Sequence, residues 1–162
     1  MKDLNDINEF PETARVWIYQ SNKDLSETSV SSVDAKIEHF ARRWTSHNAA
    51  LKATGALMRN RFIVLVVNDA QTGVGGCSID SSVQFVRNLG EECGVDFMDR
   101  MNFAYLESEE VRTVHKDDLP ALYAEGKIND NTIFFDNLVS TKKDFVDGWL
   151  KPLGDSWMKR FV

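Results

Sequence analysis

Residues 61–90 decide the fold, and they read, in succession, RFIVLVVND, AQTGVGGCSID and SSVQFVRNLG. The run Phe62–Val67 contains no polar residue, which predicts a strand buried on both faces at the centre of a sheet. Ile79, Val83, Val86 and Leu89 follow at helical spacing and predict one apolar stripe of a helix. The glycine-rich connection between strand and helix is where we expect a functional site.

The segments outside this stretch predict further strands and helices. Apolar or β-branched runs predict strands at residues 15–20, 53–58, 102–106, 111–114 and 132–135. Cap residues and apolar stripes predict helices from Ser26 to Trp44, from Asp117 to Gly126, and from Thr141 to Pro152. The first two-thirds of the chain therefore has the order β-α-β-β-α-β, which is typical of a ferredoxin-like fold.

Length and composition predict one domain over residues 1–162. The order of the predicted elements makes it an α+β domain, with helices packed on a mainly antiparallel sheet. The chain has 162 residues, 43% hydrophobic and 27% charged, which suits a single domain with its own core. No internal repeat or linker-like stretch divides it. Residues 1–13 are polar and are expected to form a loosely ordered leader as far as Pro11.

The charge balance argues against nucleic-acid binding. The net charge is -6, whereas binding to phosphates needs a basic face. Residues 34–62 are locally basic, and residues 91–136 are locally acidic. This asymmetry has two interpretations: two solvated faces of opposite sign, or an anion-binding patch near Arg59 and Arg61.

The chain shows no sign of a membrane segment, a metal framework or a cofactor motif. No stretch approaches the roughly 20 apolar residues that cross a bilayer, and the N-terminus has no apolar signal core. A cytoplasmic location is therefore expected, with Cys77 and Cys93 reduced. The spacing of the two cysteines does not predict a metal site.

The glycine-rich loop could hold an anion on its backbone. Glycines before a helix allow a ligand to approach closely, and the first helical N–H groups attract negative charge. A phosphate-binding P-loop, however, needs a lysine after its last glycine, and here Gly76 is followed by Cys77. ATP hydrolysis is therefore not expected. The structural alternative is a turn with positive φ, capped by Ser78.

Cys77 is the candidate nucleophile of this stretch. It precedes the predicted helix, where the helix dipole favours the thiolate. His47 is the histidine that could act as its base, and Asp80 could be either a general base or a dipole-stabilising acid in the first turn. The alternative for Cys77 is a plain loop thiol or a small buried residue. Asn68 ends the central strand, where ligand contacts and turns are both common.

A resemblance to a known family rests on five short segments of the chain. They are NRFIVLVV, GCSIDSSVQFVR, GVDFMDR, EEVRTV and the terminal DSW. The chain resembles small bacterial proteins that are often labelled ABC-transporter ATPases, from about Arg15 to its end. The resemblance implies no particular activity and no particular functional residues. The chain lacks the P-loop lysine and signature loop that the ATPase label would require.

Two functional hypotheses follow, and a third remains open. In the first, the chain is a non-catalytic domain that binds a partner or a small anionic ligand through the loop 73–81. Its site residues would be Gly75, Gly76, Ser78, Ser81, Asn68, Arg59 and Arg61. In the second, it is an enzyme or redox-sensitive protein with Cys77 as nucleophile and Asp80 nearby. The third is an oligomeric structural protein, which an exposed patch containing Trp149, Trp157 and Phe161 would indicate.

Overall fold

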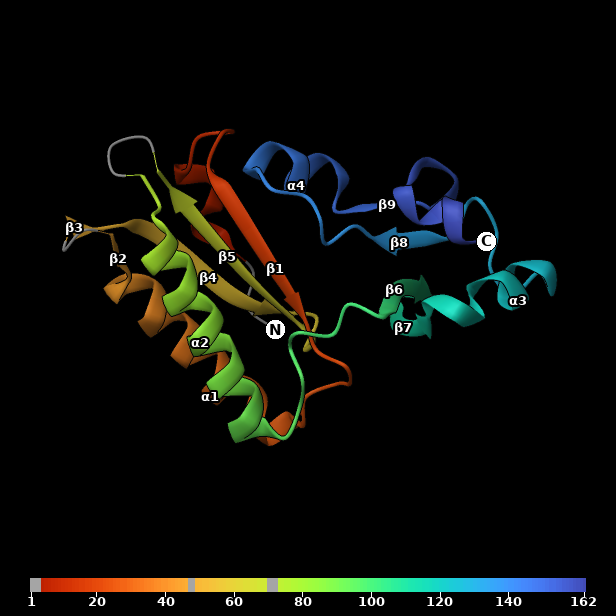
Figure 1. The fold of residues 1–162 in the computed structure, drawn as a ribbon, viewed down its shortest axis with the longest axis horizontal. Coiled ribbons are helices and arrows are strands. Elements are labelled where there is room, and N and C mark those ends of the chain that lie inside the picture. Colours follow the sequence, from red (N-terminus) through yellow and green to blue (C-terminus); the bar gives the residue numbers. More distant parts are fainter. Residues whose placement is uncertain (1–3, 47–48, 70–72) are drawn as a thin grey trace.

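The computed structural model describes residues 4–46, 49–69 and 73–162, which form a mixed α+β structure with antiparallel sheets (Figure 1). The strands are β1 (Arg15–Gln20), β2 (Thr45–Ser46), β3 (Ala49–Ala50), β4 (Lys52–Met58), β5 (Phe62–Asn68), β6 (Asn102–Glu107), β7 (Glu110–His115), β8 (Ile133–Phe135) and β9 (Leu150–Pro152). The helices are α1 (Glu27–Arg43), α2 (Gly76–Cys93), α3 (Leu119–Ala124) and α4 (Lys142–Gly148), and the short 3-10 helices are η1 (Asn5–Glu9), η2 (Lys116–Asp118), η3 (Leu153–Asp155) and η4 (Trp157–Phe161). The α+β prediction is confirmed.

The first sheet has the order β1-β5-β4, so the predicted central strand does lie at its centre. Both neighbours of β5 are antiparallel to it. Strands β4 and β5, which follow each other in the chain, form a hairpin. Arg59 and Asn60 have φ of 52° and 56°, and the Arg61 N–H donates to the Met58 carbonyl at 3.1 Å. Positive φ at both central residues is the geometry that matches the twist of paired strands.

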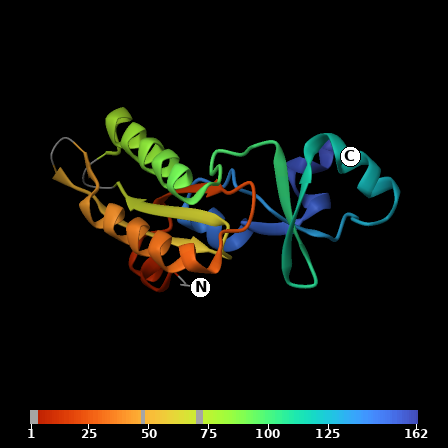
Figure 2. The same cartoon turned by 90° about the horizontal axis from the view of Figure 1, so that it is seen from below.

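Strand β5 is buried on both faces, as its unbroken apolar run predicts. Ile63, Leu65 and Val67 face a cluster that includes residues of α1 and α2. Phe62, Val64 and Val66 belong to a second cluster, shared with β8 and α4. Figure 2 shows α1 and α2 running along the same sheet. The sheet is therefore covered on both faces rather than on one.

The ferredoxin-like arrangement is not confirmed, because β6 does not join the first sheet. Strand β6 pairs with β7 and β8 in a second sheet of order β7-β6-β8-β9. Ser108 and Glu109, between β6 and β7, have φ of 51° and 69°, as in a two-residue hairpin turn. This local turn pairs β6 with the strand that follows it, so the edge of β1 that β6 would have covered is left for another segment.

The end of that β1 edge is covered by the segment before α4. The Val16 N–H donates to the Ser140 carbonyl at 2.9 Å, and the Lys142 N–H donates to the Ala14 carbonyl at 2.8 Å. These bonds connect β1 to the chain between β8 and α4. The second sheet has its own apolar cluster, in which Leu119, Phe134 and Leu153 are fully buried. Figure 1 shows this sheet beside the first, with α3 beyond it.

Two expectations at the ends of the chain are wrong. Part of the expected loose leader is ordered: residues 5–9 form η1, and Leu4 and Phe10 are buried in the core. The apolar side chains of this polar segment pack against the sheet, which explains its order; residues 1–3 lie outside the described ranges. The last long helix ends at Gly148, and Leu150–Pro152 forms the edge strand β9, where proline is tolerated because the edge N–H has no partner to lose.

Candidate functional site

The glycine-rich loop has a different geometry from the one that we predict. Helix α2 begins at Gly76 and its N-cap is Gly75 with φ of -80°, so Ser78 lies inside the helix and not at its cap. No described glycine of the loop has a positive φ. Ser78 is buried, and its hydroxyl donates to the Thr45 carbonyl at 2.7 Å. Its role is to anchor α2 to β2.

A hollow of about 370 Å³ lies beside the start of α2, and we name it the loop hollow. Its lining consists of Thr45, Ser46, Gly75, Gly76, Cys77, Ser78 and Ser81. Cys77 and Ser81 are exposed there. Asp80 is also exposed, but it lies beyond the first turn of α2, so its expected first-turn position is wrong. His47, the expected base, lies outside the described residues.

The basic residues of the first hypothesis lie far from the loop. Arg59 and Arg61 are in the turn before β5, whereas Asn68 is at the other end of this strand. Seven strand residues separate the two ends by about 20 Å. Arg61 is only 7% exposed, and its Nε lies 3.5 Å from a carboxylate oxygen of Asp24, an ion pair by distance that lacks hydrogen-bond geometry. The structure therefore does not bring these residues into one site.

The two cysteines differ in access. Cys77 is exposed, whereas Cys93 is half-buried. Burial raises the pKa of the Cys93 thiol above its usual value, and the nearby Lys36 ammonium only partly offsets this. A raised pKa leaves less thiolate at a given pH, and the thiolate is the species that reacts.

We expect Cys77 to be alkylated faster than Cys93 at pH 8, by on the order of tenfold. The measurement compares iodoacetamide reaction rates of Cys93→Ser, which keeps Cys77, and Cys77→Ser, which keeps Cys93. Equal rates, or a faster reaction in Cys77→Ser, would contradict the exposure difference seen here.

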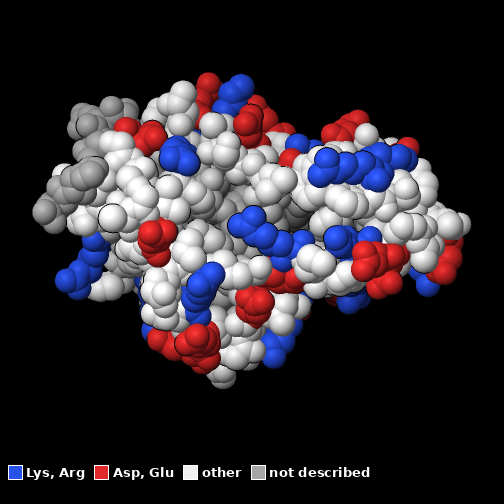
Figure 3. All heavy atoms as spheres, viewed as in Figure 1, with Lys and Arg blue, Asp and Glu red and all other residues white. Residues whose placement is uncertain are grey.

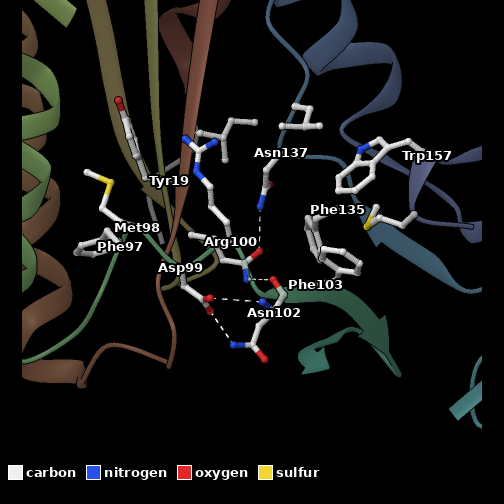
Figure 4. Close-up of a pocket in the computed structure, with 14 residues that line it drawn as sticks. Tyr19, Phe97, Met98, Asp99, Arg100, Asn102, Phe103, Phe135, Asn137 and Trp157 are labelled. Atoms are coloured by element: carbon white, nitrogen blue, oxygen red, sulfur yellow. Dashed lines mark hydrogen bonds between the residues drawn. The ribbon is translucent and has the colours of Figure 1, made fainter. Parts of the chain in front are cut away.

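A second cavity, of about 230 Å³, lies between the two sheets, and we name it the inter-sheet pocket (Figure 4). Three segments far apart in sequence contribute most of its lining. They are residues 18–20 of β1, residues 97–100 and 102–103 before and within β6, and Phe135 of β8 with residues 137–138 after it. Trp157 and Met158 of η4 complete it. In contrast to the loop hollow, it combines aromatic walls with buried polar side chains, which is the usual composition of a ligand site.

A chain of amide side chains holds the inter-sheet pocket together. The Gln20 amide donates to the Asn102 carbonyl at 3.0 Å, and the Asn137 amide donates to Gln20 Oε1 at 2.9 Å. The Trp149 indole N–H donates to Asn137 Oδ1 at 2.9 Å. Gln20 is 4% exposed, so these bonds are shielded from water. These hydrogen bonds fix β1, β6 and the segment after β8 relative to one another.

Arg100 supplies a positive charge at this pocket. Its neighbour Asp99 is engaged elsewhere, because its carboxylate accepts from the Met101 N–H at 3.0 Å and from the Asn102 side-chain amide at 3.0 Å. Within the described ranges, Arg100 makes no ion pair or hydrogen bond. Figure 4 shows its side chain rising past Asp99 between Tyr19 and Asn137. Its guanidinium is therefore available to an anion.

The aromatic wall is held in place by a buried carboxylate. The Trp157 indole N–H donates to Asp136 Oδ1 at 2.9 Å, and the Trp157 ring meets Phe103 edge-on at 5.4 Å. Asp136 is 6% exposed, and its other oxygen pairs with the Lys151 ammonium at 2.9 Å. These two contacts fix the Trp157 ring in the wall of the pocket.

Figure 3 shows acidic and basic side chains interspersed over one face of the molecule, with basic atoms beside a hollow between the two sheets. A large field of one sign does not cover this face, which suits a local anion contact better than a broad charged partner.

Sequence reasoning missed most of the inter-sheet pocket. Gln20 is the last residue of β1, Asn102 is the first residue of β6, and Asn137 follows the end of β8 by two positions. The position after TIFFD does mark Asn137 as a candidate for a ligand contact or a turn, but no comparable pattern marks Gln20 or Asn102. Arg100 gave no such signal, because its isolation depends on how Asp99 folds back onto the backbone.

The fold and the pocket define an α+β protein with a cavity of about 230 Å³ between two antiparallel sheets. Comparison with known proteins found no matching family model, curated protein or solved structure. The resemblance to small bacterial proteins therefore stays a prediction. Among the described helices none is long and apolar enough to cross a membrane, and the same part of the chain holds no cluster of three or more potential metal ligands.

Proposed function

We propose that this chain is a non-catalytic binding domain, whose inter-sheet pocket holds a small ligand with a carboxylate or similar anion attached to an apolar group. Arg100 binds the anion, and the wall formed by Phe103, Phe135 and Trp157 receives the apolar group. The observation that carries the proposal is Arg100, a cation without an ion pair in the described structure, at a cavity with aromatic walls.

The size of the pocket limits the ligand. A cavity of about 230 Å³ is smaller than the range of roughly 300–1,000 Å³ that holds drug-sized molecules. The polar groups that line it are largely bonded to one another, so the pocket offers few unoccupied donors besides the Arg100 guanidinium. Such a site selects for one charge and one apolar body rather than for a highly polar molecule.

Phenylbutyrate is a suitable probe, with phenylbutanamide as its neutral isostere. We expect calorimetry to show that Arg100→Gln weakens phenylbutyrate binding by about tenfold, because a charge-assisted hydrogen bond is lost. Phenylbutanamide should bind wild type and Arg100→Gln equally. Arg87→Gln is the matched control, since Arg87 is an exposed arginine on α2, outside the pocket.

If neither compound binds, or if Arg100→Gln and Arg87→Gln weaken phenylbutyrate binding equally, the proposed function is wrong. The alternative, cysteine-dependent chemistry, is favoured by one observation, the exposure of Cys77 at the loop hollow. Loss of a measured activity in Cys77→Ser, with ligand binding intact, would support that alternative.

A further inference from the structure

The outer edge of β1 offers an unused backbone donor and acceptor inside the inter-sheet pocket. The Val16 N–H points away from β5, since it donates to the Ser140 carbonyl at 2.9 Å. Backbone groups of alternate residues point to the same side of a strand, so the Ile18 N–H and C=O also point outward. Ile18 lines the pocket, and within residues 4–46, 49–69 and 73–162 these two groups have no partner on that side.

A local turn explains why the pairing stops before Ile18. The segment that covers Val16 would, if extended, place Leu138 opposite Ile18, given the register Arg15↔Thr141. Instead, the Leu138 N–H donates to a carboxylate oxygen of Asp136 at 3.0 Å, which bends the chain away. The Leu138 side chain is 63% exposed as a result. Ile18 and Leu138 both line the inter-sheet pocket, and we name the part of this pocket beside β1 the slot.

We infer that the inter-sheet pocket binds the C-terminal end of an extended peptide. This inference rests on the proposed function and names its ligand class. The peptide backbone pairs with the Ile18 N–H and C=O by strand addition, and its terminal carboxylate binds the Arg100 guanidinium. The last side chain, which is apolar, enters the space beside Phe103 and Trp157.

Three features favour a peptide over other apolar anions. A donor and an acceptor on one edge residue match the backbone of an added strand, which a simple carboxylate would leave unsatisfied. The cavity has room for about one apolar side chain and its carboxylate. Leu138 and Met101, exposed at 63% and 46%, are two of the large apolar residues at the surface, and both belong to segments that border the slot.

The test uses an acetylated tetrapeptide of threonine, valine, alanine and a C-terminal leucine, and follows the backbone amide signal of Ile18 by NMR. We expect the peptide to shift this signal and to slow exchange of its proton with solvent. Affinity should exceed that of phenylbutyrate by about tenfold or more, since backbone hydrogen bonds are added. Capping the carboxylate as an amide should cost about tenfold, and Arg100→Gln should remove this difference.

A second probe keeps the test independent of protein folding. N-methylation of the last peptide bond removes the donor of the probe and should weaken binding by about tenfold, whereas N-methylation of the first bond should not. If phenylbutyrate binds at Arg100 but the tetrapeptide leaves the Ile18 signal unchanged, the inference fails and the proposed function stands. If neither probe binds, both fail. Tetrapeptide binding that is indifferent to amide capping also overturns the inference.

Discussion

Replacing Asp136 by alanine is expected to lower the free energy of unfolding by about 3 kcal/mol, because a buried carboxylate with several partners is removed. The change leaves the Lys151 ammonium without its partner at 2.9 Å and the Trp157 indole N–H without an acceptor. It also removes the bond that bends the chain at Leu138. Urea denaturation, followed by circular dichroism, measures the effect.

Two further variants show which part of the Asp136→Ala effect comes from the charge and which from the loss of any buried carboxylate contact. Asp136→Asn keeps an acceptor for Trp157 but removes the charge opposite Lys151, so we expect an intermediate loss of about 1–2 kcal/mol. Asp155→Ala removes an exposed carboxylate in η3, and should change stability by less than about 0.5 kcal/mol. An Asp136→Ala loss no larger than that of Asp155→Ala would contradict the role given to this carboxylate.

Replacing Gly90 by alanine is expected to cost about 2 kcal/mol, because the new methyl group has no room. A Cβ at this position would lie 2.7 Å from the Val95 carbonyl oxygen. That oxygen belongs to backbone, and the Val95 N–H is fixed by its bond to the Gly90 carbonyl at 3.0 Å. The end of α2 would therefore have to shift, together with the chain that leads into the inter-sheet pocket.

Gly76→Ala is the matched control for Gly90→Ala. Gly76 lies at the other end of the same helix, and a Cβ there would meet no atom within 4 Å. We expect its stability to be unchanged or raised by up to about 1 kcal/mol, since alanine restricts the unfolded chain more than glycine does. Equal losses in the two variants would show that the close approach at Gly90 is not the cause.

The sequence predicts those parts of the fold that depend on local patterns. The apolar run of β5 and the stripe of α2 are sufficient for a central strand covered by a helix, and the cap at Thr141 is formed as expected, with the Asp144 N–H donating to its hydroxyl at 3.1 Å. Gly94 is the C-cap of α2, with φ of 69°. These features depend on residues a few positions apart.

The partner of β6 could not be predicted in the same way. Its pattern fits either an edge of the first sheet or a new sheet, and the hairpin turn at Ser108 and Glu109 decides between them. Neither residue is a glycine, although both adopt positive φ, so the usual signal for such a turn is absent. The inter-sheet pocket exists because β6 belongs to a second sheet, so the sequence could not predict the pocket either.

The candidate site shows the same limit. Glycines and a cysteine attract attention to residues 73–81 because their chemistry is visible in the sequence. Arg100 becomes significant only when Asp99 is seen to bond the backbone, and Gln20 only when its amide is seen to join segments 117 positions apart. Such long-range relations carry no local pattern.

The most direct test of the central claim is the ¹H–¹⁵N NMR spectrum of the protein during titration with phenylbutyrate. We predict shifts of the Trp157 indole signal and of the side-chain amide signals of Gln20 and Asn137, while the backbone signals of Cys77 and Ser81 stay in place. Shifts at Cys77 and Ser81 with an unchanged Trp157 signal would contradict the account, because they would place the binding site at the loop hollow.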